Sequence, residues 1–296
     1  MRALCLALWA GVSAFGLVQC GPGHEGSLSV PKLVVALKPD KNPEQMMEEQ
    51  RKLEGFLSDA LGEPVEVIIP LSDAVIEEGL LNGTVDLAYI SGGTMLRIWQ
   101  EGIANILLAG EIEGRTDYDS YWVSLSDSPY EGVESLRGQP VAFASVSSTS
   151  GYLVPHWDLV KRGLLEKGAD PEDFFGVGNV FFGSGYVSAV ERVLEGEAEA
   201  AAVSYYVLDR GKHLSEEQRQ RLRAVAVQGP VPTNALAVRA SLPEEDQAAL
   251  RAALLRLNEE GNEALRDRVF TSKLVEVDPA AHLAPLREAF EFTGRQ

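Results

Sequence analysis

Cysteine is almost absent from this sequence of 296 residues, because the two cysteines, Cys5 and Cys20, both lie within its first twenty positions. A chain that begins at Cys20 after processing has no second cysteine with which to form an internal disulfide. Histidine is also rare, and the four histidines are too scattered for any two to have zinc-ligand spacing. We therefore expect no disulfide framework and no metal site.

Basic residues are few relative to acidic ones: 26 lysines and arginines stand against 44 aspartates and glutamates, which gives a net charge of -18. A nucleic-acid partner is excluded, because neutralising a run of phosphates needs many cations. Electrostatic attraction to an anionic membrane surface is excluded for the same reason. A single small anion is not excluded, because a few aimed donors hold it while the overall charge mainly sets solubility and encounter rate.

Long apolar runs are missing except at the N-terminus, where Met1-Arg2 precedes sixteen mostly apolar residues, 3–18. This run is short for a bilayer about 30 Å thick and fits the core of a signal peptide better. It ends at Leu17-Val18-Gln19-Cys20, which resembles a bacterial lipobox, although Gln19 stands where a small residue is usual. We expect residues 1–19 to be removed, Cys20 to carry a lipid and residues 20–31 to form a tether. An uncleaved anchor helix is the alternative, and both place the body of the chain outside the cytoplasm.

Short apolar segments alternate with segments of helical periodicity along the rest of the chain. The expected strands are 33–37, 65–69, 85–90, 103–109, 141–144, 180–182, 200–203 and 224–227. The expected helices are 43–61, 74–81, 149–165, 187–194, 244–265 and 282–292. Strands separated by helices form mostly parallel sheets, and 296 residues are many for one core. We predict an α/β fold of two lobes with a ligand cleft between them. Lobe I would comprise residues 32–118 and 233–296, including the C-terminal helices, and lobe II residues 119–232, with two hinge crossings.

The most informative local feature is the run of hydroxyl side chains from Ser145 to Ser150, directly after the strand 141–144 and before a helix. The start of a helix presents unpaired amides and a partial positive charge, so it receives anions readily. The hydroxyls of Ser148, Thr149 and Ser150 would add a neutral cradle suited to a tetrahedral oxyanion. Ordinary helix capping also explains such a run, and spacing alone does not separate the two interpretations.

A second polar turn, Ser91-Gly92-Gly93-Thr94, follows the strand 85–90 and precedes a further helix. It would face the cleft from the other lobe, with Ser91 and Gly92 offering a hydroxyl and amides; a glycine turn with a cap is the alternative. Tyr121 at the first crossing, and Tyr205 or Tyr206 after a strand end, would line the cleft or pack at the hinge, and Tyr186 is a weaker candidate.

An activated nucleophile is not visible in the sequence. Ser150 lacks the Gly-x-Ser-x-Gly context of a nucleophile elbow, and His156 is expected in the helix behind the serines. Gly176-Val177-Gly178 lacks the third glycine of a dinucleotide fingerprint. We therefore expect no catalytic residue, no cofactor and no enzyme activity.

Several segments, taken in order, resemble the phosphate, phosphite and phosphonate-binding protein family of ABC importers, from about residue 33 to about residue 240. They are Gly83 to Tyr89, Leu136 to Phe143, Ser148 to Gly151 with Pro155, Phe174-Phe175, Phe182 to Ser184 and Val203 to Leu208. The resemblance implies a type II periplasmic binding protein fold, a partner permease and ATPase, and a Ser-Thr-Ser grip on the phosphorus oxygens. That role carries onto Ser148, Thr149 and Ser150.

The sequence departs from the family pattern where the organic substituent of the ligand is read. Gly185 stands where aminophosphonate binders often have histidine, and Ser204 stands where they often have aspartate. A carboxylate near a dianion would repel it, so the loss of an aspartate at Ser204 fits a ligand without an ammonium group. Asp40 stands where a tyrosine is expected, and its carboxylate would repel a dianion unless it pairs with a lysine. Ile90 stands where the family commonly has an aromatic residue.

These observations predict an extracytoplasmic, lipid-anchored, monomeric solute-binding protein of an ABC importer. Its ligand would be phosphite, phosphate, a simple alkylphosphonate or another small oxyanion, bound by the serine run, Ser91, Gly92, Tyr121, Ser204, Tyr205 and Asp40. Two alternatives stay open: a lipoprotein sensor that signals to a partner, and an enzyme on the same fold.

Overall fold

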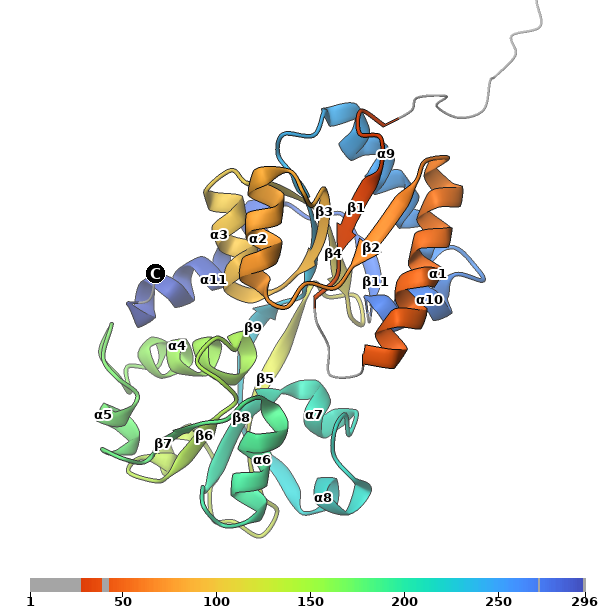
Figure 1. Cartoon of the computed structure of the whole chain (residues 1–296). Coiled ribbons are helices and arrows are strands. Elements are labelled where there is room, and N and C mark those ends of the chain that lie inside the picture. The colour runs from red at the N-terminus through yellow and green to blue at the C-terminus, as the bar shows by residue number, and fades with distance from the viewer. Residues whose placement is uncertain (1–27, 39–42, 271, 295–296) are drawn as a thin grey trace, which may run out of the picture.

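The computed structural model describes residues 28–38, 43–270 and 272–294. They form two lobes, each built on one β-sheet with helices on both of its faces (Figure 1). The sheet of lobe I has the strand order β11-β4-β10-β3-β1-β2, and the sheet of lobe II has the order β7-β6-β8-β5-β9. The predicted two-lobed α/β fold is confirmed.

The elements follow the chain in nearly alternating order. The strands of lobe I are β1 (Leu33–Ala36), β2 (Val65–Ile68), β3 (Leu87–Ile90), β4 (Ala104–Glu111), β10 (Ala235–Arg239) and β11 (Lys273–Val275). Its helices are α1 (Pro43–Leu61), α2 (Asp73–Asn82), α3 (Gly92–Gln100), α9 (Glu244–Leu255), α10 (Glu263–Val269) and α11 (Pro279–Thr293). The strands of lobe II are β5 (Asp117–Leu125), β6 (Val141–Phe143), β7 (Val180–Phe182), β8 (Ala200–Ser204) and β9 (Leu222–Pro232). Its main helices are α4 (Val154–Lys161), α5 (Glu172–Phe175), α6 (Tyr186–Leu194), α7 (Tyr205–Asp209) and α8 (Glu216–Gln220).

Both sheets are mixed, although most strands share one direction as predicted. β1 pairs in parallel with β2 and β3, whereas β10 pairs antiparallel with β3 and β4. In lobe II, β6 pairs in parallel with β7 and β8, whereas β5 pairs antiparallel with β8 and β9. Three of the described strands run against the others: β5, β10 and β11, which pairs antiparallel with β4. β5 and β10 are the first strands to enter each sheet from the other lobe, so no helical crossover precedes them. The strands β5, β10 and β11 are not among those predicted from the sequence.

The apolar pattern of β1 shows how the sequence builds lobe I. Alternate side chains of a strand point to opposite faces of the sheet. Leu33 and Val35 pack in one buried cluster with Leu53 and Leu57 of α1, and Ala36 packs in the cluster on the other face. The strand is therefore covered on both sides, which explains its nearly continuous apolar run.

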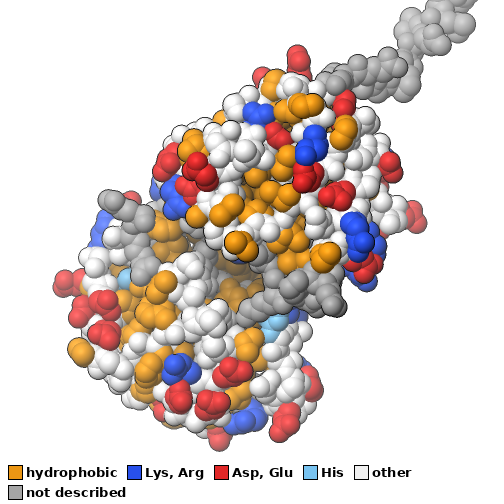
Figure 2. Space-filling view, viewed as in Figure 1, with side chains coloured by type: hydrophobic (Ala, Val, Ile, Leu, Met, Phe, Trp, Pro, Cys, Tyr) orange, Lys and Arg blue, Asp and Glu red, His pale blue; other side chains and the backbone are white. Residues whose placement is uncertain are grey.

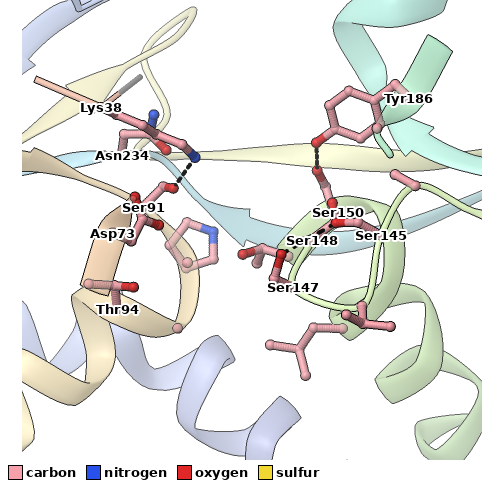
Figure 3. A pocket seen from close by; sticks show the side chains of 18 of the residues that line it. Lys38, Asp73, Ser91, Thr94, Ser145, Ser147, Ser148, Ser150, Tyr186 and Asn234 are labelled. Atoms are coloured by element: carbon pink, nitrogen blue, oxygen red, sulfur yellow. Dashed lines mark hydrogen bonds between the residues drawn. The ribbon is translucent and has the colours of Figure 1, made fainter. Parts of the chain in front are cut away.

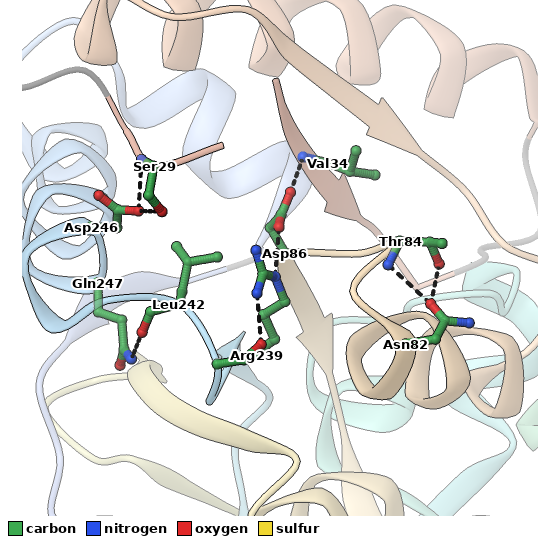
Figure 4. A network of polar contacts seen from close by, with 10 residues as sticks. Ser29, Val34, Asn82, Thr84, Asp86, Arg239, Leu242, Asp246 and Gln247 are labelled. Carbon is green, nitrogen blue, oxygen red and sulfur yellow. Dashed lines mark hydrogen bonds and ion pairs between the residues drawn. The ribbon is translucent and has the colours of Figure 1, made fainter. Parts of the chain in front are cut away.

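Asp86, in the segment before β3 that resembles the family, has a structural role (Figure 4). Its carboxylate accepts a hydrogen bond from the Val34 amide at 2.8 Å and pairs with Arg239 Nε at 2.8 Å. The Asp86 side chain is 4% exposed, so this buried charge requires both partners. It joins β1 to the end of β10, two segments that are far apart in the sequence.

Two strand connections cross between the lobes, as Figure 1 shows: β4 leads to β5, and β9 leads to β10. The predicted lobe boundaries at residues 118 and 232 lie on β5 and at the end of β9 and stay predictions. α11 was expected on lobe I but contacts both lobes, since it packs on α3 and on α4 and the Phe292 carbonyl accepts from the Gly168 amide at 2.9 Å. It also packs against β9, which leads back to lobe I.

Two predicted helices differ in extent from the structure. The helix expected over 149–165 begins as the π-helical turn η2 (Thr149–Leu153), continues as α4 and ends at Lys161. The helix expected over 244–265 is interrupted after the 3₁₀ turn η3 (Arg256–Asn258), because Gly261 adopts a positive φ of 93° between α9 and α10.

Near the N-terminus, the final part of the expected tether contacts lobe I. Leu28 is buried in the same cluster as α1, and the Ser29 amide donates to Asp246 at 3.0 Å. Cys20 and the signal segment lie outside the described residues. Across the part of the chain that the structure describes, no helix combines the length and the apolar character needed to cross a bilayer.

Candidate functional site

A cavity of about 800 Å³ lies between the two lobes and is lined by residues of both. Figure 2 shows this hollow bordered mainly by apolar and uncharged side chains, whereas acidic side chains lie on the outer surfaces of the lobes. The volume is within the range of about 300–1,000 Å³ that small-molecule sites occupy. The net charge of -18 is therefore not concentrated at the cavity.

The cavity lies at the carboxyl ends of the parallel strands, where ligands bind in open α/β sheets. A short connection joins each of the strands β2, β3, β6 and β7 to a helix or helical turn, so several helix N-termini face the same space. The lining includes Ser72 and Asp73 before and in α2, Ser91 and Gly92 at α3, Ser148 and Thr149 at η2, and Gly185 and Tyr186 at α6. The side chains of Ser72 and Ser91 do not cap their helices. The first amides of α2 and α3 therefore lack a side-chain cap and suit an anion.

Three serine hydroxyls at the cavity, those of Ser91, Ser148 and Ser150, have polar partners (Figure 3). Ser148 Oγ accepts a hydrogen bond from the Gly151 amide at 3.0 Å, and Ser91 Oγ accepts from Lys38 Nζ at 2.6 Å. Ser150 Oγ lies 2.6 Å from the Tyr186 hydroxyl. A hydroxyl that accepts from a fixed donor keeps its own proton for a ligand. For Ser150 and Tyr186, either direction of their hydrogen bond leaves one of the two hydroxyl protons available.

The surroundings of Ser150 suit binding better than catalysis. Tyr118 donates to Ser150 Oγ at 3.4 Å, and burial raises the pKa of Tyr118 well above the ordinary tyrosine value. Tyr118 therefore stays protonated and remains a donor at physiological pH. A serine nucleophile requires a general base beside its hydroxyl, whereas the recorded partners of Ser150 Oγ are two phenols.

The charged groups at the cavity are few and nearly balanced. Among the described residues, one lysine, Lys38, and one arginine, Arg97, line the cavity. Arg97 is paired with Glu77 through Nε at 2.8 Å and through Nη2. Asp73 of lobe I also lines the cavity. Hydroxyls, amides and one lysine thus supply the attraction for an anion, and the Asp73 carboxylate disfavours further negative charge on the wall formed by lobe I.

The two polar turns predicted from the sequence meet across the cleft. Gly92 begins α3 with a positive φ of 56°, and a Cβ atom at this position would lie 2.2 Å from Thr149 Oγ1. A side chain at position 92 would therefore require the Thr149 side chain or one of the lobes to move. The start of α3 in lobe I therefore contacts the start of η2 in lobe II, and both face the cavity.

The structure brings most of the predicted site residues together. Those that line the cavity are Ser91, Gly92, Ser148, Thr149 and Ser150. Tyr121, Ser204 and Tyr205 do not line it: Tyr121 donates to Asp209 at 2.8 Å, Ser204 is fully buried, and Tyr205 packs against Tyr118 at 5.7 Å between ring centroids. Asp40 lies outside the described residues. The ligand-binding roles stay predictions.

Sequence reasoning missed several lining residues, notably Tyr118, Asp73 and Asn234. Tyr118 and Tyr121 lie on the same strand three positions apart, so they point to opposite faces. This alternation shows that only one of them can face the cavity, but it does not show which. Among the described residues, no group of three or more histidine, cysteine, aspartate or glutamate side chains could hold a metal ion.

A two-lobed α/β architecture with a polar cavity at the crossings defines the class of type II periplasmic binding proteins. The sequence model of the family described as "ABC transporter, phosphonate, periplasmic substrate-binding protein" matches residues 35–282. The chain belongs to this family.

Individual relatives are distant. The phosphate-import protein PhnD of Mycolicibacterium smegmatis is 24% identical over 182 residues, which cover 60% of this chain and 56% of the relative. The chain therefore matches little more than half of that relative's length. Among solved structures, XAC2383 from Xanthomonas citri bound to chloride has a TM-score of 0.72 at 22% identity, covering 90% of this chain and 98% of that one. PhnD1 from Prochlorococcus marinus in complex with methylphosphonate also has a TM-score of 0.72, at 16% identity, covering 90% and 99%. These likenesses concern the fold.

Proposed function

We propose that this chain is the extracytoplasmic solute-binding component of an ABC importer and that it binds a small phosphorus oxyanion between its lobes. The observation that carries the proposal is the set of serine hydroxyls next to helix starts in both lobes. Those of Ser91 and Ser148 accept from nearby donors, and that of Ser150 shares a hydrogen bond with the Tyr186 hydroxyl. Such a site offers protons to oxygen atoms from several directions, which suits a tetrahedral anion. Family membership and the methylphosphonate-bound neighbour support the same ligand class.

In this proposal the lobes close over the anion and present it to a membrane permease powered by an ATPase. Ser148, Thr149 and Ser150 would hold the anion from lobe II, and Ser91, Gly92 and Lys38 would hold it from lobe I. Tyr121, Ser204 and Tyr205 would support the cavity wall. The protein would act as a monomer without a cofactor or a catalytic residue.

A panel of anions tests the proposal. Phosphite, phosphate or methylphosphonate should raise the melting temperature, because a ligand at a hundredfold excess over its Kd stabilises the folded state by about 2.7 kcal/mol. For a chain of this size that corresponds to a rise of roughly 4–5 °C. Phosphonoacetate should give a smaller rise, because its carboxylate would meet Asp73. If no anion shifts the melting of a demonstrably folded protein, the oxyanion proposal is wrong.

We also propose that the mature chain begins at a lipidated Cys20. Leu17 and the spacing of the apolar run support this assignment, and Gln19 opposes it. A radiolabelled fatty acid should be incorporated into the wild-type protein and not into Cys20→Ala. Equal labelling of both proteins would place the lipid on another residue. Absence of label from both, with the signal segment retained, would show that residues 1–18 act as an uncleaved anchor instead.

A further inference from the structure

The π-helical turn η2 leaves one of its carbonyl groups without a helical partner. In a π-helix the carbonyl of residue i accepts from the amide of residue i+5. Leu153 donates to the Ser148 carbonyl at 3.0 Å, and Val154 donates to the Thr149 carbonyl. The next carbonyl, that of Ser150, would need an amide from Pro155, and proline has none.

Ser120 supplies the missing donor from outside the turn. Its hydroxyl donates to the Ser150 carbonyl and also lies 3.1 Å from the Val203 carbonyl. Gln228 Nε2 donates to Ser120 Oγ at 3.0 Å, so the hydroxyl accepts from Gln228 and keeps its own proton for a carbonyl. Ser120 is fully buried and Gln228 is 3% exposed, so water does not compete for these contacts.

This chain of hydrogen bonds begins on the strands that connect the lobes. Ser120 lies on β5 and Gln228 lies opposite it on β9, immediately beyond an irregularity in the register between Tyr118 and Ser120. Tyr118, two residues earlier on the same face of β5, donates to Ser150 Oγ. The crossing strand β5 therefore holds Ser150 by both its carbonyl and its hydroxyl.

We propose that Ser120 and Gln228 are positioning residues of the oxyanion site. Neither lines the cavity, so they act on the ligand only through Ser150. Their hydrogen bonds fix the plane of the peptide that follows Ser150 and thereby the direction of the donors at the start of η2. Small errors in donor direction weaken an anion site strongly. This inference rests on the proposed function, because it assigns these residues to the same site.

Ser120→Ala tests the inference, with Ser124→Ala as a matched control. Ser124 lies on the same strand and the same face, is 1% exposed, and its hydroxyl donates to the Glu199 carbonyl, which is remote from η2. Ser124→Ala loses one buried hydroxyl-to-carbonyl hydrogen bond, whereas Ser120→Ala loses contacts to two carbonyls and removes the acceptor of Gln228 Nε2. Both melting temperatures should therefore fall, and that of Ser120→Ala should fall further. Only Ser120→Ala should weaken binding of the best anion of the panel, by about tenfold in Kd measured by calorimetry. Ser120→Thr, which retains the hydroxyl, should restore most of the affinity.

A second readout needs no ligand. Hydrogen exchange of the amides from 149 to 154 should be faster in Ser120→Ala than in wild type and unchanged in Ser124→Ala. If the two alanine variants exchange alike and bind alike, the positioning role is refuted while the binding function stands. If wild type binds no anion but the exchange difference appears, the function fails and the support of η2 by Ser120 remains. Should Ser120→Ala not fold, Gln228→Leu gives the same comparison with a smaller expected change of about threefold in Kd.

Discussion

Replacing Ser148, Thr149 and Ser150 together with alanine is expected to abolish the rise in melting temperature that the best anion gives to the wild-type protein. Hydrogen bonds to a charged group contribute about 1.5–3 kcal/mol each. The loss of three such donors would weaken binding by at least a thousandfold, because each 1.4 kcal/mol is a factor of ten. Calorimetric titration of the variant should show no binding at millimolar anion.

The fold of this triple variant should survive, because most of the lost contacts are local. Ser148 caps η2 through the Gly151 amide, and the loss of one cap costs about 1 kcal/mol. Ser215→Ala is the matched control: Ser215 caps α8 of the same lobe through the Gln218 amide at 3.1 Å and lies away from the cavity. It should lower the melting temperature without changing anion affinity. If the triple variant still binds the anion with wild-type affinity, the serine run is not part of the binding site.

Most of the architecture could be predicted from local patterns, because helices and buried strands each require a characteristic spacing of apolar residues. The boundaries of α1 agree with the prediction, and the strands β1, β2 and β6 to β9 lie where apolar runs indicate them. β10 was missed, since Ala235 to Arg239 follows two prolines and its direction depends on pairing with β3 and β4. Such pairing joins residues more than a hundred positions apart and leaves no local signal.

The candidate site was predictable where function depends on residues adjacent in the sequence. The hydroxyl run at 148–150 and the turn at Ser91-Gly92 could be recognised because helix starts have preferred residues. The groups that orient those hydroxyls come from other strands and helices: Tyr186 from α6, Tyr118 from β5 and Lys38 from the end of β1. Their contribution appears only when the sheets are assembled. The π-helical start of the helix was equally hidden, although Pro155 is consistent with it in retrospect.

The Gly92–Thr149 contact makes one glycine a sensitive test of how the two lobes meet. Gly92→Ala is expected to weaken anion binding by tenfold or more. A Cβ atom 2.2 Å from Thr149 Oγ1 cannot be accommodated without moving one lobe or turning the Thr149 side chain away from the ligand. Overlaps of this kind cost about 1–3 kcal/mol, and a left-handed φ adds about 1–2 kcal/mol for any residue other than glycine. Calorimetry gives the affinity, and small-angle scattering with saturating anion should show a larger radius of gyration than for wild type.

Gly102→Ala separates the two costs, because Gly102 follows the same helix with a φ of 68° and has open space where its Cβ would lie. It should destabilise the fold by the backbone cost alone and leave the affinity unchanged. Thr149→Ala removes the atom that overlaps, since the Thr149 Cβ would remain 3.5 Å away, an ordinary contact. In the Thr149→Ala background, the losses of stability and of anion affinity caused by Gly92→Ala should be no larger than those caused by Gly102→Ala. The double-mutant cycle in Kd should then give a coupling of at least about tenfold. If the effects of Gly92→Ala and Thr149→Ala on anion affinity are additive, the Gly92–Thr149 contact is not needed to hold the anion. The two lobes would then have to meet elsewhere along the cleft when they close.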